Sequence, residues 1–192
     1  MKKKVIFLLA GFCLIVALLP SCTGNLKEED LPGGLRDGSD TNTPKSIASK
    51  EITRFECEFL ADASLNYGYY FFRMERKSDG ALCSATGIDD FELLFDLEFT
   101  APLSALDELQ DMIDEHHLIE LNGIDKHTNG LPENLGSLIH VTYASGERLY
   151  AYDNSSSVLS NQAALALHDL FRDLAQEAGH HFSADEEKDM EG

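Results

Sequence analysis

Apolar and polar residues alternate along four runs of the chain, and this pattern predicts four β-strands. In the first run, Phe55, Cys57 and Phe59 are separated by charged residues, which is the two-residue period of a half-buried strand. The runs cover residues 53–59, 67–76, 81–86 and 91–99. Alternation is strongest in the last run, whose apolar residues should face inward: Phe91, Leu93, Phe95, Leu97 and Phe99. Short connections between the runs favour an antiparallel meander.

The spacing of the apolar residues then lengthens to three and four, which predicts an amphipathic helix. Leucines follow Pro102 at this spacing as far as Ile113, and proline is favoured in a first helical turn. We expect this helix to end near His117. A second helical stripe covers residues 161–178 and should stop at Gly179, because glycine commonly follows a helix C-terminus.

A loop and a hairpin are expected between these helices. Glycines and prolines interrupt residues 122–136, which indicates a loop. Residues 138–143 and 148–152 alternate and flank Ser145-Gly146, so we expect a hairpin with a two-residue turn. Paired residue numbers would then sum to 291. This register would place four residues on one face: Ile139, Val141, Tyr150 and Tyr152.

The predicted order of elements is ββββ-α-ββ-α, which indicates the α+β class. Half-polar strands and two amphipathic helices fit a two-layer sandwich, in which the helices cover one face of an antiparallel meander sheet and solvent covers most of the other. A chain of 192 residues, 43% of them hydrophobic, can close one core of this kind. We therefore expect a single α+β domain over residues 51–179.

The N-terminal residues have the order of an export signal. Three lysines follow Met1, and the apolar run at residues 5–19 is shorter than the ~20 residues of a membrane-spanning helix. The next residues, Leu19-Pro20-Ser21-Cys22, resemble the bacterial lipobox, although Pro20 stands where a small or β-branched residue is usual. The resemblance implies that residues 1–21 are a lipoprotein signal peptide and that Cys22 carries fatty acyl chains such as palmitate. These chains would anchor the protein stably on the extracytoplasmic face of the cell membrane.

Composition predicts flexible segments on both sides of the domain. Residues 22–50 contain few large apolar residues, so we expect a lipidated flexible tether, and the acidic residues 180–192 should form a disordered tail. The order of helix, Asn122-Gly123 loop, hairpin and closing helix is similar to small α+β domains that follow lipoprotein signals in uncharacterised bacterial surface proteins. That resemblance covers residues 51–178 in pattern and implies no activity.

The net charge limits the partners of the protein. Asp and Glu number 34 against 15 Lys and Arg, giving a formal charge of −19, which excludes nucleic acid because phosphates need a basic surface. An anionic leaflet should also repel the protein, so we expect the lipid anchor to make the membrane contact. The Gly33-Gly34 pair lacks the Lys-Ser/Thr of a phosphate-binding loop, and we expect no cofactor.

Cys57 and Cys83 are the cysteines of the predicted domain, and export would permit a disulfide between them. A hairpin turn at Asp79-Gly80, a pair that tolerates positive φ, would set Cys83 beside Arg76. Both thiols would face inward, but their strands would lie two spacings apart, about 9.5 Å, beyond the ~7 Å limit between bonded Cα atoms. A disulfide would require the first and third strands to be neighbours, and two buried free thiols are the other possibility.

An aromatic run offers candidate partner-binding residues. If Tyr70 and Phe72 fill the core, Tyr69 and Phe71 lie on the opposite sheet face, where a cell-surface protein or glycan could bind. A covering loop or helix would instead make them structural. We therefore expect a lipid-anchored extracytoplasmic binding or interaction domain of unknown ligand, without enzymatic activity.

Two other classes of function stay open. His117, Glu120 and His127 could form a loop-built site for a cell-envelope hydrolase or a metal, although their spacing matches no zinc motif and we assign no metal. The acidic pair at 89–90 and residues 122–129 hold oxygen ligands but lack the spacing of a calcium loop. A purely structural accessory lipoprotein is the remaining alternative.

Overall fold

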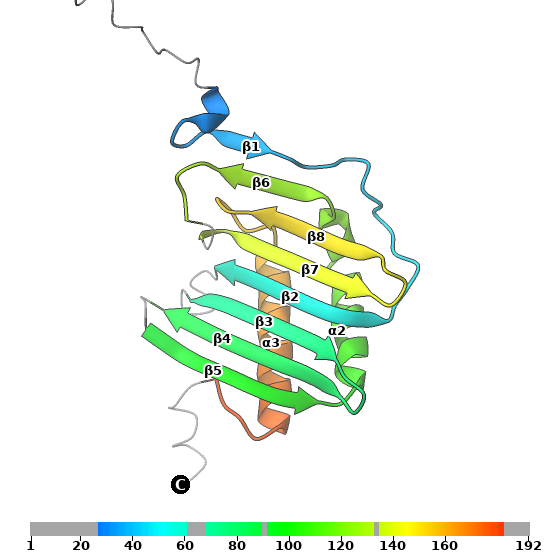
Figure 1. Cartoon of the computed structure of the whole chain (residues 1–192). Coiled ribbons are helices and arrows are strands. Elements are labelled where there is room, and N and C mark those ends of the chain that lie inside the picture. The colour runs from blue at the N-terminus through cyan, green and yellow to red at the C-terminus, as the bar shows by residue number, and fades with distance from the viewer. Residues whose placement is uncertain (1–26, 61–67, 90–91, 133–134, 183–192) are drawn as a thin grey trace, which may run out of the picture.

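One β-sheet organises the protein in the computed structural model, which describes residues 27–60, 68–89, 92–132 and 135–182. Eight strands lie in the order β1-β6-β8-β7-β2-β3-β4-β5 (Figure 1). Their bounds are β1 Leu35–Asp37, β2 Ile52–Leu60, β3 Tyr69–Arg76, β4 Ala81–Asp89, β5 Glu92–Ala101, β6 Ile124–Thr128, β7 Ser137–Tyr143 and β8 Arg148–Asp153. Neighbours are antiparallel except β6 and β8. The predicted signal peptide and Cys22 lie outside the described residues.

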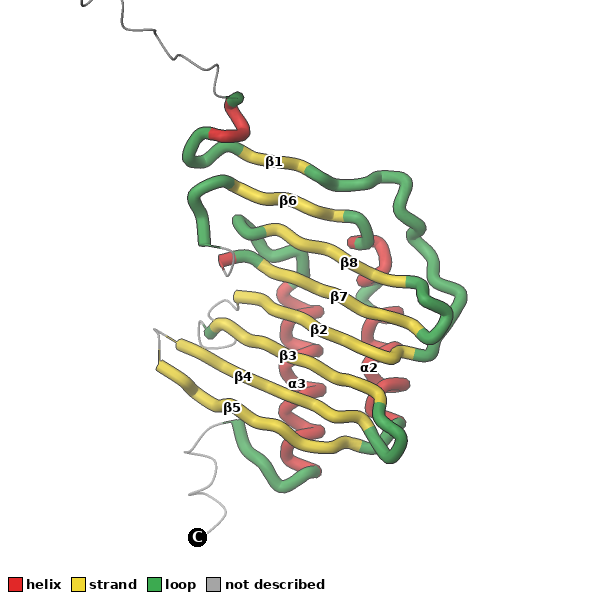
Figure 2. The backbone as a smooth tube through the Cα atoms, in the orientation of Figure 1, coloured by secondary structure: helices red, strands yellow, loops and turns green. Residues whose placement is uncertain are grey.

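Two α-helices, α2 (Ser104–Glu115) and α3 (Asn161–Glu177), cover one face of the sheet. Figure 2 shows both of them behind the strands, so that these helices leave the front face open. Two short 3-10 helices, η1 (Glu28–Asp30) and η3 (Leu118–Leu121), precede β1 and follow α2. The predicted α+β class is therefore confirmed, with the expected two helices and two layers.

The covered face of the sheet is apolar because alternate residues of each strand point toward the helices. In β2, Phe55, Cys57 and Phe59 are fully buried, whereas the charged residues between them are not. At the centre, Phe72 of β3 stacks on Phe171 of α3 with ring centroids 4.5 Å apart. Both rings are fully buried, so this contact joins the two layers. The predicted four-strand meander is present as β2-β3-β4-β5.

Strand β6 lies within residues 122–136, where we expected only loop, so that prediction is wrong in part. Its sequence, IDKHT, shows no apolar alternation, and none of its residues is fully buried. Backbone pairing holds the strand instead, antiparallel with β1 and parallel with β8. Main-chain hydrogen bonds have no side-chain signature, which is why the residue pattern does not reveal this strand.

The segment predicted as a flexible tether is bound to the domain in its described part. Strand β1 pairs with β6, and the chain beyond it follows the sheet edge. Gly38 N donates to Asp125 O at 2.8 Å, and Asp40 N donates to Gly123 O at 2.9 Å. The tether prediction for residues 22–50 is thus corrected from residue 27 onward. Composition misled it because hydrogen bonds to a sheet edge can order a chain that buries little apolar surface.

The β7–β8 hairpin has a register one position from the predicted one. His140 pairs with Tyr150, because the turn contains three residues and Gly146 adopts φ +85° in it. A one-residue slip moves every side chain of a strand to the other face. Tyr150 and Tyr152 therefore point away from the helices, and Leu149 takes the buried position.

The β3–β4 hairpin also differs from its predicted register. Cys83 pairs with Met74 rather than with Arg76, because residues 78–79 make the turn. Gly80 has no positive φ, contrary to the expected Asp-Gly turn. A Cβ at this glycine would lie 2.8 Å from a carbonyl oxygen of β5, so the close passage of that strand explains the residue.

Cys57 and Cys83 are both buried and free. Strand β3 lies between their strands, which keeps the thiols apart. Burial raises the pKa of Cys83 to about 12, and burial followed by the charge of Glu58 raises that of Cys57. Buried thiols of this kind are chemically inert.

An irregularity in β5 turns one predicted inward residue outward. Phe95 pairs with Gly87, but Leu93 pairs with Ile88, so a bulge shifts the register between these pairs. Leu93 is consequently 62% exposed, whereas we expected it to face the core. Phe91 lies outside the described residues.

The start of the predicted acidic tail belongs to the core. Helix α3 ends as expected before Gly179, which adopts φ +84°. Phe182 then folds back and is 6% exposed, with its ring stacked on that of Phe95 at 4.1 Å. The tail prediction for residues 180–192 is therefore wrong for its first three residues, and residues 183–192 lie outside the described part.

We predict that Phe72→Ala lowers the free energy of unfolding by about 3–5 kcal/mol, because it removes a fully buried ring from the contact between the layers. Phe71→Ala, one residue away on the other face, should cost less than about 1.5 kcal/mol. Chemical denaturation followed by circular dichroism measures both. Equal losses in the two variants would contradict the assignment of faces.

Candidate functional site

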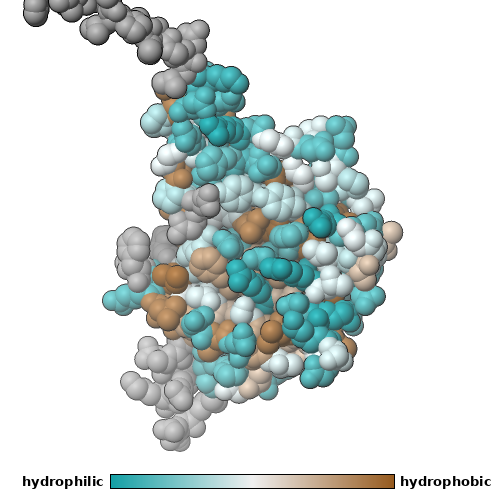
Figure 3. All heavy atoms as spheres, viewed as in Figure 1, coloured by the Kyte–Doolittle hydropathy of each residue, from teal (hydrophilic) through white to brown (hydrophobic). Residues whose placement is uncertain are grey.

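The face of the sheet opposite the helices, which we call the open face, is lined by alternate residues of six strands. Strand pairing arranges them in rows. One row consists of Tyr152, Leu138, Glu58, Phe71, Thr86 and Asp96, and the next of Tyr150, His140, Glu56, Arg73, Ser84 and Glu98. Figure 3 shows hydrophilic residues over the middle of this face and apolar residues gathered toward its left side. The open face therefore combines polar and apolar surface.

Tyr69 and Phe71 both lie on the open face, whereas Tyr70 and Phe72 fill the core. Their ring centroids are 4.6 Å apart in an edge-on contact. Tyr69 is only 9% exposed, and its hydroxyl donates to Glu58 Oε2 at 3.2 Å. Burial, followed by the charge of Glu58, raises the pKa of Tyr69. Phe71 is thus the residue of the pair that a partner can contact, and Tyr69 supports its ring.

A shallow hollow of about 320 Å³ lies beside Phe71 on the open face. Its lining is mixed and consists of Phe71, Arg73, Ser84, Thr86 and Ile88. Thr86 Oγ1 donates to Asp96 Oδ1 at 2.8 Å, and a guanidinium nitrogen of Arg73 lies 2.9 Å from Glu56 Oε1. An aromatic ring surrounded by hydroxyl and guanidinium groups suits a ligand that has both an apolar face and polar substituents.

His140 and Tyr150 form a second aromatic pair on the open face. Their ring centroids are 5.9 Å apart at 80°, and Tyr150 is 38% exposed. Sequence reasoning missed this pair because the assumed two-residue turn put Tyr150 on the same face as Ile139 and Val141, which the structure buries. Gly146 at the third position of a three-residue turn is the signal that could have corrected the register.

The residues of the alternative loop-built site do not come together. His117 follows α2 with φ 53°, Glu120 lies in η3, and His127 lies on β6. Within the described ranges, no group of three or more His, Cys, Asp or Glu side chains could hold a metal ion. Asp89 ends β4, and Asp90 lies outside the described residues. His117, Glu120 and His127 therefore form no metal-binding group of this kind in the described part of the chain.

Asn122, the first residue of the segment considered for calcium, has a structural role. It is 3% exposed, its amide nitrogen donates to Pro44 O at 2.9 Å and to Arg148 O at 3.1 Å, and its side-chain oxygen accepts from Tyr150 N at 2.8 Å. Gly123 follows with φ +91°, and a Cβ there would lie 2.5 Å from a backbone carbonyl oxygen. The pair therefore binds residues 38–50, which we call the strap, to the sheet.

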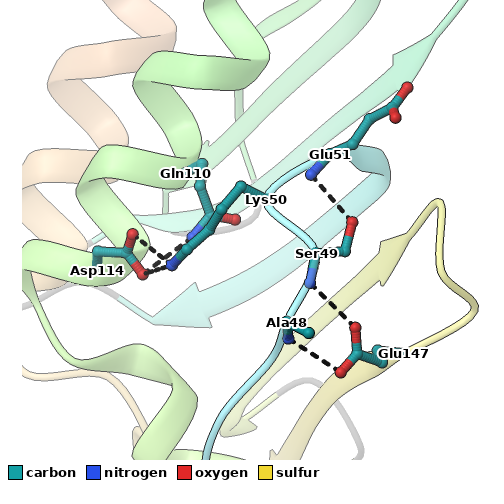
Figure 4. A network of polar contacts seen from close by, with 7 residues as sticks. All are labelled: Ala48, Ser49, Lys50, Glu51, Gln110, Asp114 and Glu147. Atoms are coloured by element: carbon teal, nitrogen blue, oxygen red, sulfur yellow. Dashed lines mark hydrogen bonds and ion pairs between the residues drawn. The ribbon is translucent and has the colours of Figure 1, made fainter.

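Charged side chains hold the far end of the strap (Figure 4). Lys50 Nζ lies 2.7 Å from both carboxylate oxygens of Asp114 on α2, and the amide of Gln110 donates to the same carboxylate at 3.0 Å. The carboxylate of Glu147 accepts from the backbone N–H groups of residues 48–49 at 3.0 and 3.1 Å. Because Lys50 and Asp114 are exposed, we attribute the order of the strap mainly to its backbone contacts.

Comparisons with known proteins give no information about the open face, so its role is inferred from its geometry. No family model matches the chain, and no curated protein or solved structure resembles it significantly. Among the helices of the described residues, none is both long and apolar enough to cross a membrane.

We predict that Asn122→Ala lowers the free energy of unfolding by about 2–4 kcal/mol, because it removes a buried amide and leaves three backbone groups without their partner. Asn129→Ala is the matched control, since Asn129 also bonds two carbonyl groups but is only half-buried, and its cost should stay below about 1 kcal/mol. Urea titration of both variants tests this. An unchanged free energy of unfolding in Asn122→Ala would contradict the role of Asn122 in holding the strap on the sheet.

Proposed function

We propose that the protein is a lipid-anchored extracytoplasmic domain that binds a cell-surface partner through the hollow beside Phe71. The observation that carries this proposal is the position of the hollow, on the face that α2 and α3 do not cover. Its mixture of ring, hydroxyl and guanidinium groups supports recognition rather than further packing. The lipobox-like Cys22 supports the location.

Pairing of β1 with β6 limits how far the domain can move from the proposed anchor. Helix η1 begins at Glu28, six residues after Cys22, and contacts β1. A fully extended chain of six residues spans at most about 20 Å. The β1 edge of the sheet would therefore stay close to the membrane, and the open face would meet partners at the cell surface.

Replacing Cys22 by serine should abolish incorporation of labelled palmitate and release the protein from the membrane fraction, because serine lacks the acceptor thiol. Cys13→Ser, which changes the other N-terminal cysteine, should keep both properties. Metabolic labelling and fractionation of cells measure the outcome. Palmitate that remains on the Cys22→Ser chain would refute the proposed anchor.

Capture of partners from solubilised envelopes should depend on Phe71. We expect Phe71→Ala to lower the recovery of its specific partners at least about fivefold, the effect of losing one central interface contact. Leu82→Ala is the matched control, because Leu82 lies on the open face but does not line the hollow. Quantitative mass spectrometry and glycan analysis of the captured material compare the variants. Equal recovery with Phe71→Ala would contradict the proposed binding surface.

A further inference from the structure

Three arginines lie near one another on the open face of a chain that is strongly acidic as a whole. Asp and Glu outnumber Lys and Arg by 34 to 15, yet Arg54, Arg73 and Arg148 are all exposed on adjoining rows of this face. Strand pairing sets Arg54 and Arg148 on either side of Thr142. Their Cα atoms are therefore about 10 Å apart, two strand spacings. We call Arg54, Thr142 and Arg148 the arginine corner.

The carboxylates around the corner do not neutralise it. Glu56 Oε2 lies 3.2 Å from Arg54, and Glu56 Oε1 lies 2.9 Å from Arg73, so one carboxylate serves two guanidinium groups. Glu75 faces Arg54 across the strands but pairs with a lysine at 2.8 Å. Arg148 makes no ion pair with any residue in the described part of the chain. The corner consequently has positive charge available to an anion.

His140 and Tyr150 place two rings beside the arginine corner. Burial lowers the pKa of His140; the charge of Glu56 opposes this effect, and the charges of Arg148 and Arg54 add to it. The imidazole is therefore in an environment that disfavours its protonation while the corner is empty of anions. The negative charge of a bound carboxylate would favour the protonated imidazole and so oppose the effect of burial.

We propose that the partner of the open face is a polysaccharide that carries carboxylate groups, which deepens the proposed function and rests on it. Its carboxylates bind the guanidinium groups of Arg54 and Arg148, whose planar forks donate paired hydrogen bonds to carboxylates. The C–H faces of its sugar rings pack on Tyr150 and on Phe71. Its hydroxyl groups reach the serine and threonine of the hollow.

The negative net charge of the protein does not prevent this contact. Carboxylates more than about 8 Å from the bound anion are largely screened at physiological ionic strength. The arginine corner then determines the local interaction. Densely charged polymers such as nucleic acids remain disfavoured, since they would also face the surrounding carboxylates. Exposed rings and a hydroxyl-lined hollow beside the cations favour a saccharide over an acidic peptide, which would bring no ring faces.

Binding of three polymers to the full chain in detergent micelles tests the proposal. Polygalacturonate should bind, and more weakly as salt is raised, whereas neutral dextran and polyglutamate should not. Arg148→Gln and Arg54→Gln should each weaken the binding of polygalacturonate about tenfold, the effect of one charge-assisted contact. Arg172→Gln on α3 is the matched control and should leave it unchanged. Arg148→Gln breaks no ion pair of the described residues, so a folding defect is not expected to obscure its result.

Each outcome decides between the possibilities. Equal binding of dextran would overturn the requirement for carboxylates, and equal binding of polyglutamate would assign the corner to acidic peptides. No binding of polygalacturonate, or unchanged binding by both arginine variants, would overturn the inference. If envelope capture still depends on Phe71 in that case, the proposed function stands without it.

Acidification gives an independent readout. As the pH falls below about 6.5, the ordinary value from which burial lowers the pKa of His140, protonation of the imidazole adds a positive charge beside the corner, so the affinity for polygalacturonate should rise. The groups that face His140 are Glu56 and Arg54 on β2 and Arg148 and Tyr150 on β8. His140→Gln should flatten this part of the pH profile. If the affinity of His140→Gln for polygalacturonate has the same pH dependence as that of the unchanged protein, the imidazole does not contribute to the site.

Discussion

The stacking of Phe72 on Phe171 determines which side of the protein can meet a partner. Successive side chains of a strand point to opposite faces, so burying Phe72 under α3 turns Phe71 away from the helices. The apolar stripes of α2 and α3 are both buried. Figure 1 shows both helices on the same side of the sheet. The polar and aromatic residues of the other face therefore do not have to pack in the core. Core packing in this way decides on which face the candidate site lies.

Side-chain burial explains which parts of the fold could be predicted. The strands β2 to β5 and both helices bury one stripe of residues, and this leaves a period in the sequence. Strands β1 and β6 are ordered by main-chain pairing at the sheet edge, which any residues can make. Turn length also limits prediction from sequence. The β7–β8 turn has one residue more than predicted, which places Tyr150 on the face opposite to the expected one.

The candidate site was predictable only where it depends on neighbours in sequence. Alternation from Phe72 alone places Phe71 on the open face. The burial of Tyr69 depends on Glu58 from another strand, and the arginine corner unites residues of β2, β7 and β8. Long-range strand order creates these groupings, and a single sequence shows that order only where turns are short and their register is certain.

The acidic remainder of the surface acts together with the arginine corner. Carboxylates around a small group of cations repel anions that approach elsewhere, so they limit binding to ligands whose charges match the positions of Arg54 and Arg148. The same charges protect the exposed strand edge: Asp96 and Glu98 lie along β5, where like-charge repulsion discourages a second copy from adding its own β5. Under the proposed function, the net charge would suppress non-specific contacts at the cell surface, while the arginine corner would attract the partner.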